Sequence, residues 1–486
     1  MSELNCFAGL FSVKTKKRAS NSLKLVTTMD SPLSMEVLMK ELNDVYKKKV
    51  HKKLPKSFMS SVQKMTVYAE NSLYAAEMYD TALQKMREKK KVRIVSANVP
   101  EGILPTGNPA ILHDIRVNGH GPDDEIYNKD SEVRKLIPRG ATILEFKGKS
   151  DVVIYANKKF TGGVGDEDEH QPENNDLWKQ YCLEDPSTSS KVVCMNKVNG
   201  EAAHFSGRYI EGRFYLFTGS KNVHMLIRER KDIELYDGER YTVAKVVARS
   251  LWDTLNDLDA KHRQLMFSFL HYTKCTAVCE LLQPENQHII NLSHLDKPQL
   301  NVISFTPVYS EYEESSLLAL PPHHTLNLLT ALGFTSPAYS IIEAKDVLQH
   351  QTKVRSELYK EGEVLYFLNK NEETIGMAKS KTFWYIIIRA LREKAVYCFT
   401  SNKKPQNWCL EDGICSTCTR LEEIQNWLKF SDSYLQRWKE MGKGFLQWLS
   451  EELEKEQIAV EDIRPKFPII WEKFLSDKEW TDKIYP

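Results

Sequence analysis

The sequence has no apolar run long enough to cross a bilayer and no dominant charge of either sign. Its 486 residues carry a net charge of +1, so no global field steers a nucleic acid to the protein. The first residues lack the basic-then-apolar order of a secretory signal, although residues 4–29 contain no acid and leave a transit peptide open. We therefore expect a cytoplasmic or nuclear protein, with a mitochondrial location less favoured.

Most of the cysteines are scattered along the chain and show no paired spacing. There are nine cysteines, an odd number, which in a chain of this length favours a reducing compartment over a disulfide framework. One exception is a group within 21 residues, which ends in "CSTC" and could hold zinc: Cys398, Cys409, Cys415 and Cys418. The first two lack paired spacing, so a reduced and partly buried set is the alternative.

The sequence also argues against two other classes of phosphate-handling protein, the P-loop kinases and the cyclic phosphodiesterases. No G-x-x-x-x-G-K-[ST] stretch occurs, so we expect no P-loop. Two H-x-T triplets, at 271–273 and 350–352, have the signature of cyclic phosphodiesterases. Such a site needs both histidines on facing strands of one cleft, and 350–352 falls in a helical pattern.

Apolar periodicity divides the chain into three regions. Residues 32–91 repeat apolar positions every three to four residues, and later residues alternate short β-branched and aromatic strands with a few helices. After Lys381 the pattern is helical again. We predict an α+β protein with a helical N-terminal module (1–92), a central domain (93–385) and a helical C-terminal module (386–486). The polar stretch 165–176 is expected to be a mobile surface loop.

One short motif suggests covalent chemistry. "KVNG" places Lys197 two residues before Asn199 and directly after an apolar strand. The simple interpretation is a hairpin turn at Asn199-Gly200 with a solvated lysine beside it. The other interpretation is a lysine nucleophile held beside a nucleotide. A near copy, "RVNG" at 116–119, shows that the motif alone is weak.

The order of later motifs favours the nucleophile. "AVCELL" contains Glu280, "VISF" ends at Phe305, and "EGEV" begins with Glu361. "MAKSK" then holds Lys379 and Lys381 at alternate positions, hence on one face if extended. This series resembles motifs I, III, IIIa, IV and V of the covalent nucleotidyltransferases, which are ATP-dependent ligases and mRNA capping enzymes.

Further segments narrow the resemblance. The asparagine in "KVNG" and the "GSKN" at 219–222 look like the tRNA-ligase branch, and "IPRGATILEF" and "VVIYANKKF" resemble segments that precede the lysine motif in phage and fungal RNA ligases. Here Thr-Gly follows Lys159-Phe160, where those ligases have Phe-Asn. The resemblance covers residues 135–385. With its flanks, the chain resembles the animal, lancelet-type ATP-dependent 5′-phosphate/3′-hydroxyl RNA ligases, which implies a nucleotidyltransferase (adenylyltransferase) fold for the central domain.

The resemblance implies a role for each motif residue. Lys197 would take AMP from ATP, and Lys379 and Lys381 would stabilise the charge on the phosphoryl group. Two carboxylates would hold Mg²⁺, or Mn²⁺ in its place: Glu280 and Glu361. The remaining residues would bind the nucleotide: Arg139 and Lys159 through the β- and γ-phosphates, Phe305 by stacking on adenine, and Asn199 and Lys221 by further contacts. The alternative for Phe305 is an ordinary core residue.

The expected partner is RNA with 5′-phosphate and 3′-hydroxyl ends, and neither a membrane nor a protein partner is required. Two alternatives stay open. One is a capping-type guanylyltransferase, which a comparison of ATP and GTP would distinguish. The other is a nucleotidyltransferase-like RNA-binding protein without catalysis, whose RNA affinity should respond to Lys197→Ala by no more than one phosphate contact.

Overall fold

Three β-sheets form the centre of the protein in its computed structural model, which describes residues 31–105, 108–119, 121–167, 171–311, 314–402 and 404–486. The sheets have the strand orders β1-β2-β3-β4, β11-β10-β7-β8-β9 and β12-β6-β13-β14-β5, and their strands pair antiparallel except for β14 with β5. The first sheet comprises β1 (Val92–Asn98), β2 (Ala110–Val117), β3 (Ala141–Phe146) and β4 (Lys149–Tyr155). The second comprises β7 (Glu201–Ile210), β8 (Arg213–Ser220), β9 (His224–Ile227), β10 (Thr276–Leu282) and β11 (Gln299–Thr306). The third comprises β5 (Thr161–Gly162), β6 (Lys191–Asn196), β12 (Tyr339–Glu343), β13 (Gly362–Leu368) and β14 (Thr374–Lys381).

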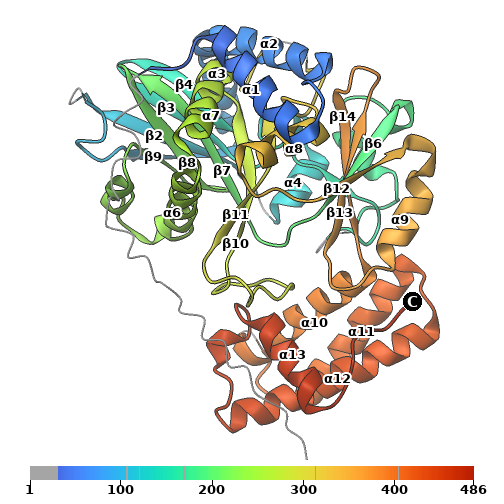
Figure 1. The fold of residues 1–486 in the computed structure, drawn as a ribbon. Helices are drawn as coiled ribbons and strands as arrows, with labels where there is room; N and C mark the ends of the chain where they lie inside the picture. Colours follow the sequence, from blue (N-terminus) through green and yellow to red (C-terminus); the bar gives the residue numbers. More distant parts are fainter. Residues whose placement is uncertain (1–30, 106–107, 120, 168–170, 312–313, 403) are drawn as a thin grey trace, which may run out of the picture.

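Helices surround the sheets and extend beyond them (Figure 1), so the fold is α+β, as predicted. Nine of the described α-helices precede β13: α1 (Met35–Val50), α2 (Lys56–Glu70), α3 (Ser72–Glu88), α4 (Asp123–Lys129), α5 (Ser131–Leu136), α6 (Thr242–Asp257), α7 (Ala260–Thr273), α8 (Pro322–Leu332) and α9 (Val347–Arg355). Four follow β14: α10 (Phe383–Thr400), α11 (Leu410–Leu428), α12 (Asp432–Glu454) and α13 (Phe467–Asp477). None of the described helices is both long and apolar enough to span a membrane.

The N-terminal helices share their cores with the sheets. Leu38 of α1 and Phe58 of α2 are fully buried in the same cluster as Phe205 of β7. Tyr79 of α3 is buried with Ile143 of β3. Helices α1 and α2 pack on α7 and α8, and α3 packs on β4 and β1. The three helices therefore complete the cores of the sheets instead of forming a core of their own.

The C-terminal helices have a core distinct from those of the sheets, and Ile289 of the segment after β10 also packs into it. Leu391, Trp438 and Phe445 are buried among α10–α13, which lie below the sheets in Figure 1. Helix α10 begins at Phe383, and its N-cap Thr382 accepts a hydrogen bond from the Tyr385 backbone N–H at 3.0 Å. A single residue therefore separates strand β14 from this helical body.

The segment around "KVNG" is not a hairpin. Strand β6 ends at Asn196 and pairs with β12 and β13, whereas β7 begins at Glu201 and pairs with β8 and β10. Residues 197–200 therefore cross from the third sheet to the second. The interpretation of Asn199-Gly200 as a hairpin turn is wrong, because the two strands it joins lie in different sheets.

Glu372, in the turn between β13 and β14, connects the helices to the third sheet. Its carboxylate accepts hydrogen bonds from Ser57 of α2 and Lys191 of β6, and lies 3.2 Å from His324 Nε2 of α8. Although burial opposes the shift, the hydrogen bonds from Lys191 and Ser57 lower the pKa of Glu372 to about 2. Burial lowers the pKa of the neighbouring His323 to about 4, and repulsion from His324 adds to the shift. Both groups therefore bind fewer protons in the folded state than in the unfolded chain.

We expect acid to weaken this junction in two stages. Free histidine and glutamate side chains take up protons near pH values of about 6.5 and about 4.3. The stability linked to His323 should be lost as the pH falls from about 6.5 toward 4, and that linked to Glu372 as it falls from about 4.3 toward 2. Thermal unfolding at decreasing pH should therefore show a shallower fall below about pH 5 for Glu372→Gln than for wild type. The exposed Glu101→Gln is the control. Equal slopes for wild type and Glu372→Gln would contradict this role.

Candidate active site

Two five-stranded sheets enclose a cavity of ≈ 240 Å³. One wall comes from β6, β13 and β14, and the other from β7, β10 and β11. Seven of the residues singled out in the sequence line this cavity although they come from a stretch that covers half of the chain: Arg139, Lys159, Lys197, Glu280, Glu361, Lys379 and Lys381. Lys379 and Lys381 face it together, which agrees with their alternate positions on β14.

Lys197 is held by the start of β13. Its backbone N–H donates to the Gly362 carbonyl at 2.8 Å, which fixes the chain as it leaves β6. Its Nζ lies 2.8 Å from Glu361 Oε1, and the exposed fractions of the two side chains are 22% and 4%. A carboxylate at this distance orients the amine, which can act as a nucleophile once it has lost its extra proton.

Asn199 clamps the same loop from the other side. Its amide nitrogen donates to Glu361 Oε2 at 2.7 Å and to the Tyr385 hydroxyl at 3.2 Å. Its amide oxygen accepts from the backbone N–H groups of Ile289 and Ile290 at 2.9 and 3.2 Å. The side chain is buried, and it uses both its donors and its acceptor. Asn199 therefore positions Glu361, and the sequence alone did not show this contact.

An aspartate at position 199 should disrupt the clamp. Asn199→Asp would replace the donor to Glu361 with a carboxylate oxygen, so two buried acids would face each other. We expect a loss of about 2–3 kcal/mol in the free energy of unfolding, measured by denaturant titration. The control is Asn407→Asp in an exposed turn, which should have little effect. Equal stabilities of the two variants would show that Asn199 does not act as a donor to Glu361.

Glu280 reaches the cavity from the second sheet. It accepts a hydrogen bond from the Gly200 backbone N–H at 3.1 Å. A Cβ at position 200 would lie 2.3 Å from the Leu281 carbonyl oxygen, so only glycine lets the loop approach β10 this closely. Burial raises the pKa of Glu280 to about 7; the Lys197 charge opposes this shift and the Glu361 charge adds to it.

Gly362 determines where the two acids of "EGEV" point. In an unbroken strand, residues 361 and 363 would share a face. Gly362 has a φ of 133°, and a Cβ there would lie 2.0 Å from the Ser380 carbonyl oxygen. Glu361 consequently lines the cavity, whereas Glu363 lies outside it and pairs with His350 Nε2 of α9 at 2.6 Å.

The cavity's acids suit a divalent cation. Glu280 and Glu361 are the carboxylates that line it among the described residues, and carboxylate oxygens are the ligands that Mg²⁺ and Mn²⁺ prefer. The raised pKa of Glu280 shows that nearby positive charge does not fully compensate this buried acid. These two residues therefore fit the site of a divalent cation, which would supply the missing charge.

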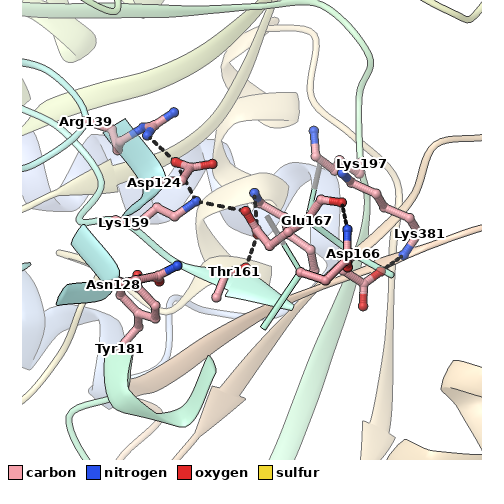
Figure 2. A network of polar contacts seen from close by, with 12 residues as sticks. Asp124, Asn128, Arg139, Lys159, Thr161, Asp166, Glu167, Tyr181, Lys197 and Lys381 are labelled. Carbon is pink, nitrogen blue, oxygen red and sulfur yellow. Dashed lines mark hydrogen bonds and ion pairs between the residues drawn. The ribbon is translucent and has the colours of Figure 1, made fainter. Parts of the chain in front are cut away.

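Cations and acids alternate at another side of the cavity (Figure 2). Asp124 lies between Arg139 and Lys159, with Oδ1 at 2.9 Å from Arg139 Nη1 and 2.8 Å from Lys159 Nζ. Glu167 lies 3.3 Å from Lys159 Nζ and 3.5 Å from Lys379 Nζ. Burial lowers the pKa of Lys159 to about 8, and repulsion from Lys379 adds to the shift. Asp124 and Glu167 thus offset the repulsion among three cations: Arg139, Lys159 and Lys379. An anionic ligand could do the same.

The polar stretch 165–176 does not begin as a mobile surface loop. Gly165 and Asp166 are buried, and the Asp166 carboxylate forms two 2.7 Å hydrogen bonds with the Arg355 guanidinium of α9. Asp166 also accepts from the Lys381 backbone N–H at 2.7 Å. The expectation of a solvated loop is therefore wrong for these two residues. The Asp166 carboxylate is paired with Arg355, and its bond to the Lys381 backbone holds the end of β14.

Phe305 does not reach the cavity. Its side chain is buried in the core of the second sheet, with its ring centroid 5.1 Å from that of Phe269. A bulge in β11 opposite Val278 changes the alternation of this strand, and Ile303 lines the cavity in its place. This corrects the expectation that Phe305 stacks on adenine. The aromatic residues that line the cavity in the described part of the chain are Phe160 and Tyr366.

Lys221 also lies outside the cavity. Its Nζ pairs with Asp123 Oδ2 at 2.9 Å, so it contacts the start of α4 instead. His204 of β7, in contrast, does line the cavity, although no sequence motif included it. Its Nδ1 lies 3.2 Å from His224 Nε2, and burial lowers the pKa of His204 to about 3. His204 is therefore a neutral wall residue at pH 7.

Two other predicted features can be placed. The triplets 271–273 and 350–352 lie in helices α7 and α9, so neither histidine is on a strand of a shared cleft. The groups of three possible metal ligands among the described residues are Cys194–His350–Glu363 and His323–His324–Glu372. Neither includes the four cysteines between 398 and 418, of which one is buried in α10 and two are exposed. The described residues therefore place no three of these four thiols close enough to share one ion, and zinc binding by them stays a prediction.

Comparison with known proteins assigns the chain to a family. The family described as "Domain of unknown function (DUF7920)" matches residues 107–392, which is more than half of the chain, and the chain belongs to it. Among solved structures, an archaeal ATP-dependent RNA ligase (form 1) is similar over 82% of this chain and 79% of that chain, with 13% sequence identity and a TM-score of 0.41. A mutant of the Naegleria gruberi RNA ligase with ATP and Mn is similar over 61% of this chain and 97% of that chain, with 9% identity and a TM-score of 0.28. No curated protein matches the chain. Similarities this weak do not establish a function, which has to be argued from the site.

Proposed function

We propose that the protein is an ATP-dependent RNA ligase that joins 5′-phosphate and 3′-hydroxyl RNA ends. The observation that carries this proposal is the ion pair between Lys197 and Glu361 in a cavity that also holds Glu280. A second set of lining residues supplies positive charge: Arg139, Lys159, Lys379 and Lys381. An amine nucleophile, two carboxylates for a divalent cation and several cations suit attack on a nucleoside triphosphate.

In the first step, Lys197 Nζ attacks the α-phosphorus of ATP. An N–P bond forms, the bond from this phosphorus to the bridging oxygen breaks, and pyrophosphate leaves with the bonding electrons. The Lys197 ammonium gives up two protons to solvent in the process and keeps one N–H in lysyl-AMP. Arg139 and Lys159 would bind the β- and γ-phosphate oxygens, and Lys379 would neutralise charge on the α-phosphoryl oxygens. A divalent cation held by the two carboxylates would add to this neutralisation.

The nucleotide base would lie against the apolar part of the wall. Met195 and Tyr366 line the cavity from the third sheet and Ile303 lines it from the second, so a base between them would contact weakly polar side chains on both sides. This assigns to Ile303 and Tyr366 the contact that the sequence pattern assigned to Phe305.

Two further steps would complete the joining reaction. An oxygen of the RNA 5′-phosphate attacks the phosphorus of lysyl-AMP, the N–P bond breaks, and the Lys197 amine takes a proton as it leaves. The RNA end then carries AMP. The 3′-hydroxyl of the second end attacks the RNA 5′-phosphorus, gives its proton to solvent and forms the phosphodiester bond as AMP leaves. Lys381, at the edge of the cavity, would neutralise the 5′-phosphate during this exchange.

A joining assay tests this function. RNA with a 5′-phosphate and a 3′-hydroxyl should be sealed in the presence of ATP and Mg²⁺ or Mn²⁺, whereas the same RNA with a 5′-hydroxyl should not. GTP should not replace ATP. A preference for GTP without joining would instead favour a capping-type guanylyltransferase. RNA binding without any reaction of ATP or GTP would favour a binding protein that has lost catalysis.

A further inference from the structure

A second and larger cavity, of ≈ 570 Å³, lies where the C-terminal helices meet the third sheet. Its lining comes from α10, from α11, from the loop around Gly165 and from Arg464 near the start of α13. Lys381 lines both this cavity and the one that contains Lys197. The two cavities therefore meet at the last residue of β14.

Positive charge dominates this second cavity. Two acids line it, Glu167 and Glu393. Six basic residues line it as well: Lys381, Arg389, Arg392, Lys394, Arg420 and Arg464. The cavity thus carries a net charge of +4, whereas the whole chain carries +1. A concave surface of one sign concentrates ligands of the opposite sign.

The acids within the cavity are already shared between cations. Glu393 lies 2.8 Å from Arg392 Nη2 and 3.0 Å from Arg464 Nη2, so one carboxylate serves two guanidinium groups. Burial lowers the pKa of Lys394, and repulsion from Arg420 adds to the shift. The positive charges are therefore crowded, and an anionic ligand would relieve their repulsion.

Aromatic side chains stand among these cations. Tyr385 and Trp427 line the cavity, and the Arg420 guanidinium lies 4.6 Å from the Trp427 ring centroid. Rows of cations interleaved with aromatic rings bind single-stranded nucleic acid, because phosphates pair with the cations and bases stack on the rings. A single phosphate or pyrophosphate would not require cations from four separate segments.

We propose that this cavity binds the phosphate backbone of the RNA strand whose 5′-phosphate receives AMP. The strand would lie along α10 and α11, with its 5′ end at Lys381, next to the nucleophile. The transfer of AMP to this 5′-phosphate rests on the proposed function. The binding of RNA in the cavity does not, and it can be measured without any reaction.

The test is the affinity for single-stranded RNA, measured by fluorescence anisotropy at several salt concentrations. Arg389→Ala, Arg420→Ala and Arg464→Ala should each weaken binding about tenfold and reduce the slope of log affinity against log salt by about 0.7. Arg420→Lys should keep most of the affinity. Arg437→Ala, an exposed arginine of α12 outside this cavity, is the matched control and should bind as wild type does. RNA with a 5′-phosphate should bind more tightly than RNA with a 5′-hydroxyl, and Lys381→Ala should remove this difference.

A second readout separates the two proposals. All three arginine variants should form lysyl-AMP from ATP at the wild-type rate when RNA is absent, because these residues do not line the cavity that holds Lys197. Unchanged RNA affinity in folded Arg389→Ala, Arg420→Ala and Arg464→Ala would overturn the inference, as would loss of lysyl-AMP formation, which would mean that the cavity serves ATP. If wild type forms no lysyl-AMP but its RNA affinity depends on these arginines, the proposed function fails and the RNA cavity stands.

Discussion

Replacing Lys197 with alanine should abolish the covalent AMP adduct and slow ATP-dependent RNA joining by at least about 1,000-fold. We expect no other lysine of the cavity to replace it, because Lys197 is the one whose Nζ pairs with Glu361, beside the carboxylates that suit a divalent cation. The same variant should still join RNA that already carries AMP at its 5′ end, since that step uses the 3′-hydroxyl as its nucleophile. Joining would be followed by gel electrophoresis with each RNA.

The control for this variant is Lys370→Ala, which removes an exposed lysine from the turn between β13 and β14. It should join both RNAs as wild type does. If Lys197→Ala retained ATP-dependent joining, another residue would have to carry the AMP. If it failed equally with both RNAs although it folds normally, Lys197 would be required for the shape of the cavity and not specifically as the nucleophile.

Lys379→Ala should slow formation of lysyl-AMP by about 100- to 1,000-fold, the usual cost of removing one preorganised donor to a developing negative charge. Lys379 faces the cavity from β14, and its Nζ lies 3.5 Å from Glu167 Oε1. Without Lys379, the Glu167 carboxylate would pair with Lys159 alone, and the cavity would offer one positive charge fewer to the phosphates. Single-turnover mixing with ATP would measure the rate of the chemical step.

Lys379→Arg separates charge from shape. It keeps the positive charge, so it should recover part of the lost rate, while the exposed Lys345→Ala should have no effect. A wild-type rate of lysyl-AMP formation in Lys379→Ala would remove this residue from the mechanism. The Glu167 pairing would then be its structural role.

The sequence predicted the elements of this fold better than their connections. Strand content and helical periodicity indicated α+β architecture, and the alternate positions of Lys379 and Lys381 place both on one face. The loop at Asn199 could be interpreted as a hairpin because local turn preferences are the same whether the next strand joins the same sheet or another. Only the pairing of β6 with β13 decides between them.

Contacts between distant segments account for the features that the sequence did not reveal. Asp166 is satisfied by Arg355, 189 residues away, so a stretch that is polar in sequence is partly buried in the fold. Phe305 follows the expected motif, but the bulge opposite Val278 turns it into the core. The basic cavity joins Arg389, Arg420 and Arg464 from segments whose charges are unremarkable one at a time.

The most direct test of the account is the mass of the protein after incubation with ATP and a divalent cation. Wild type should gain the mass of one AMP on Lys197, and the adduct should be lost when pyrophosphate is added, because the first step is reversible. Lys197→Ala should gain nothing. Protein that arrives already carrying AMP should lose it with pyrophosphate and regain it with ATP. If the mass stays that of the bare chain in all of these conditions, or if AMP is attached to a residue other than Lys197, the proposed covalent mechanism is contradicted.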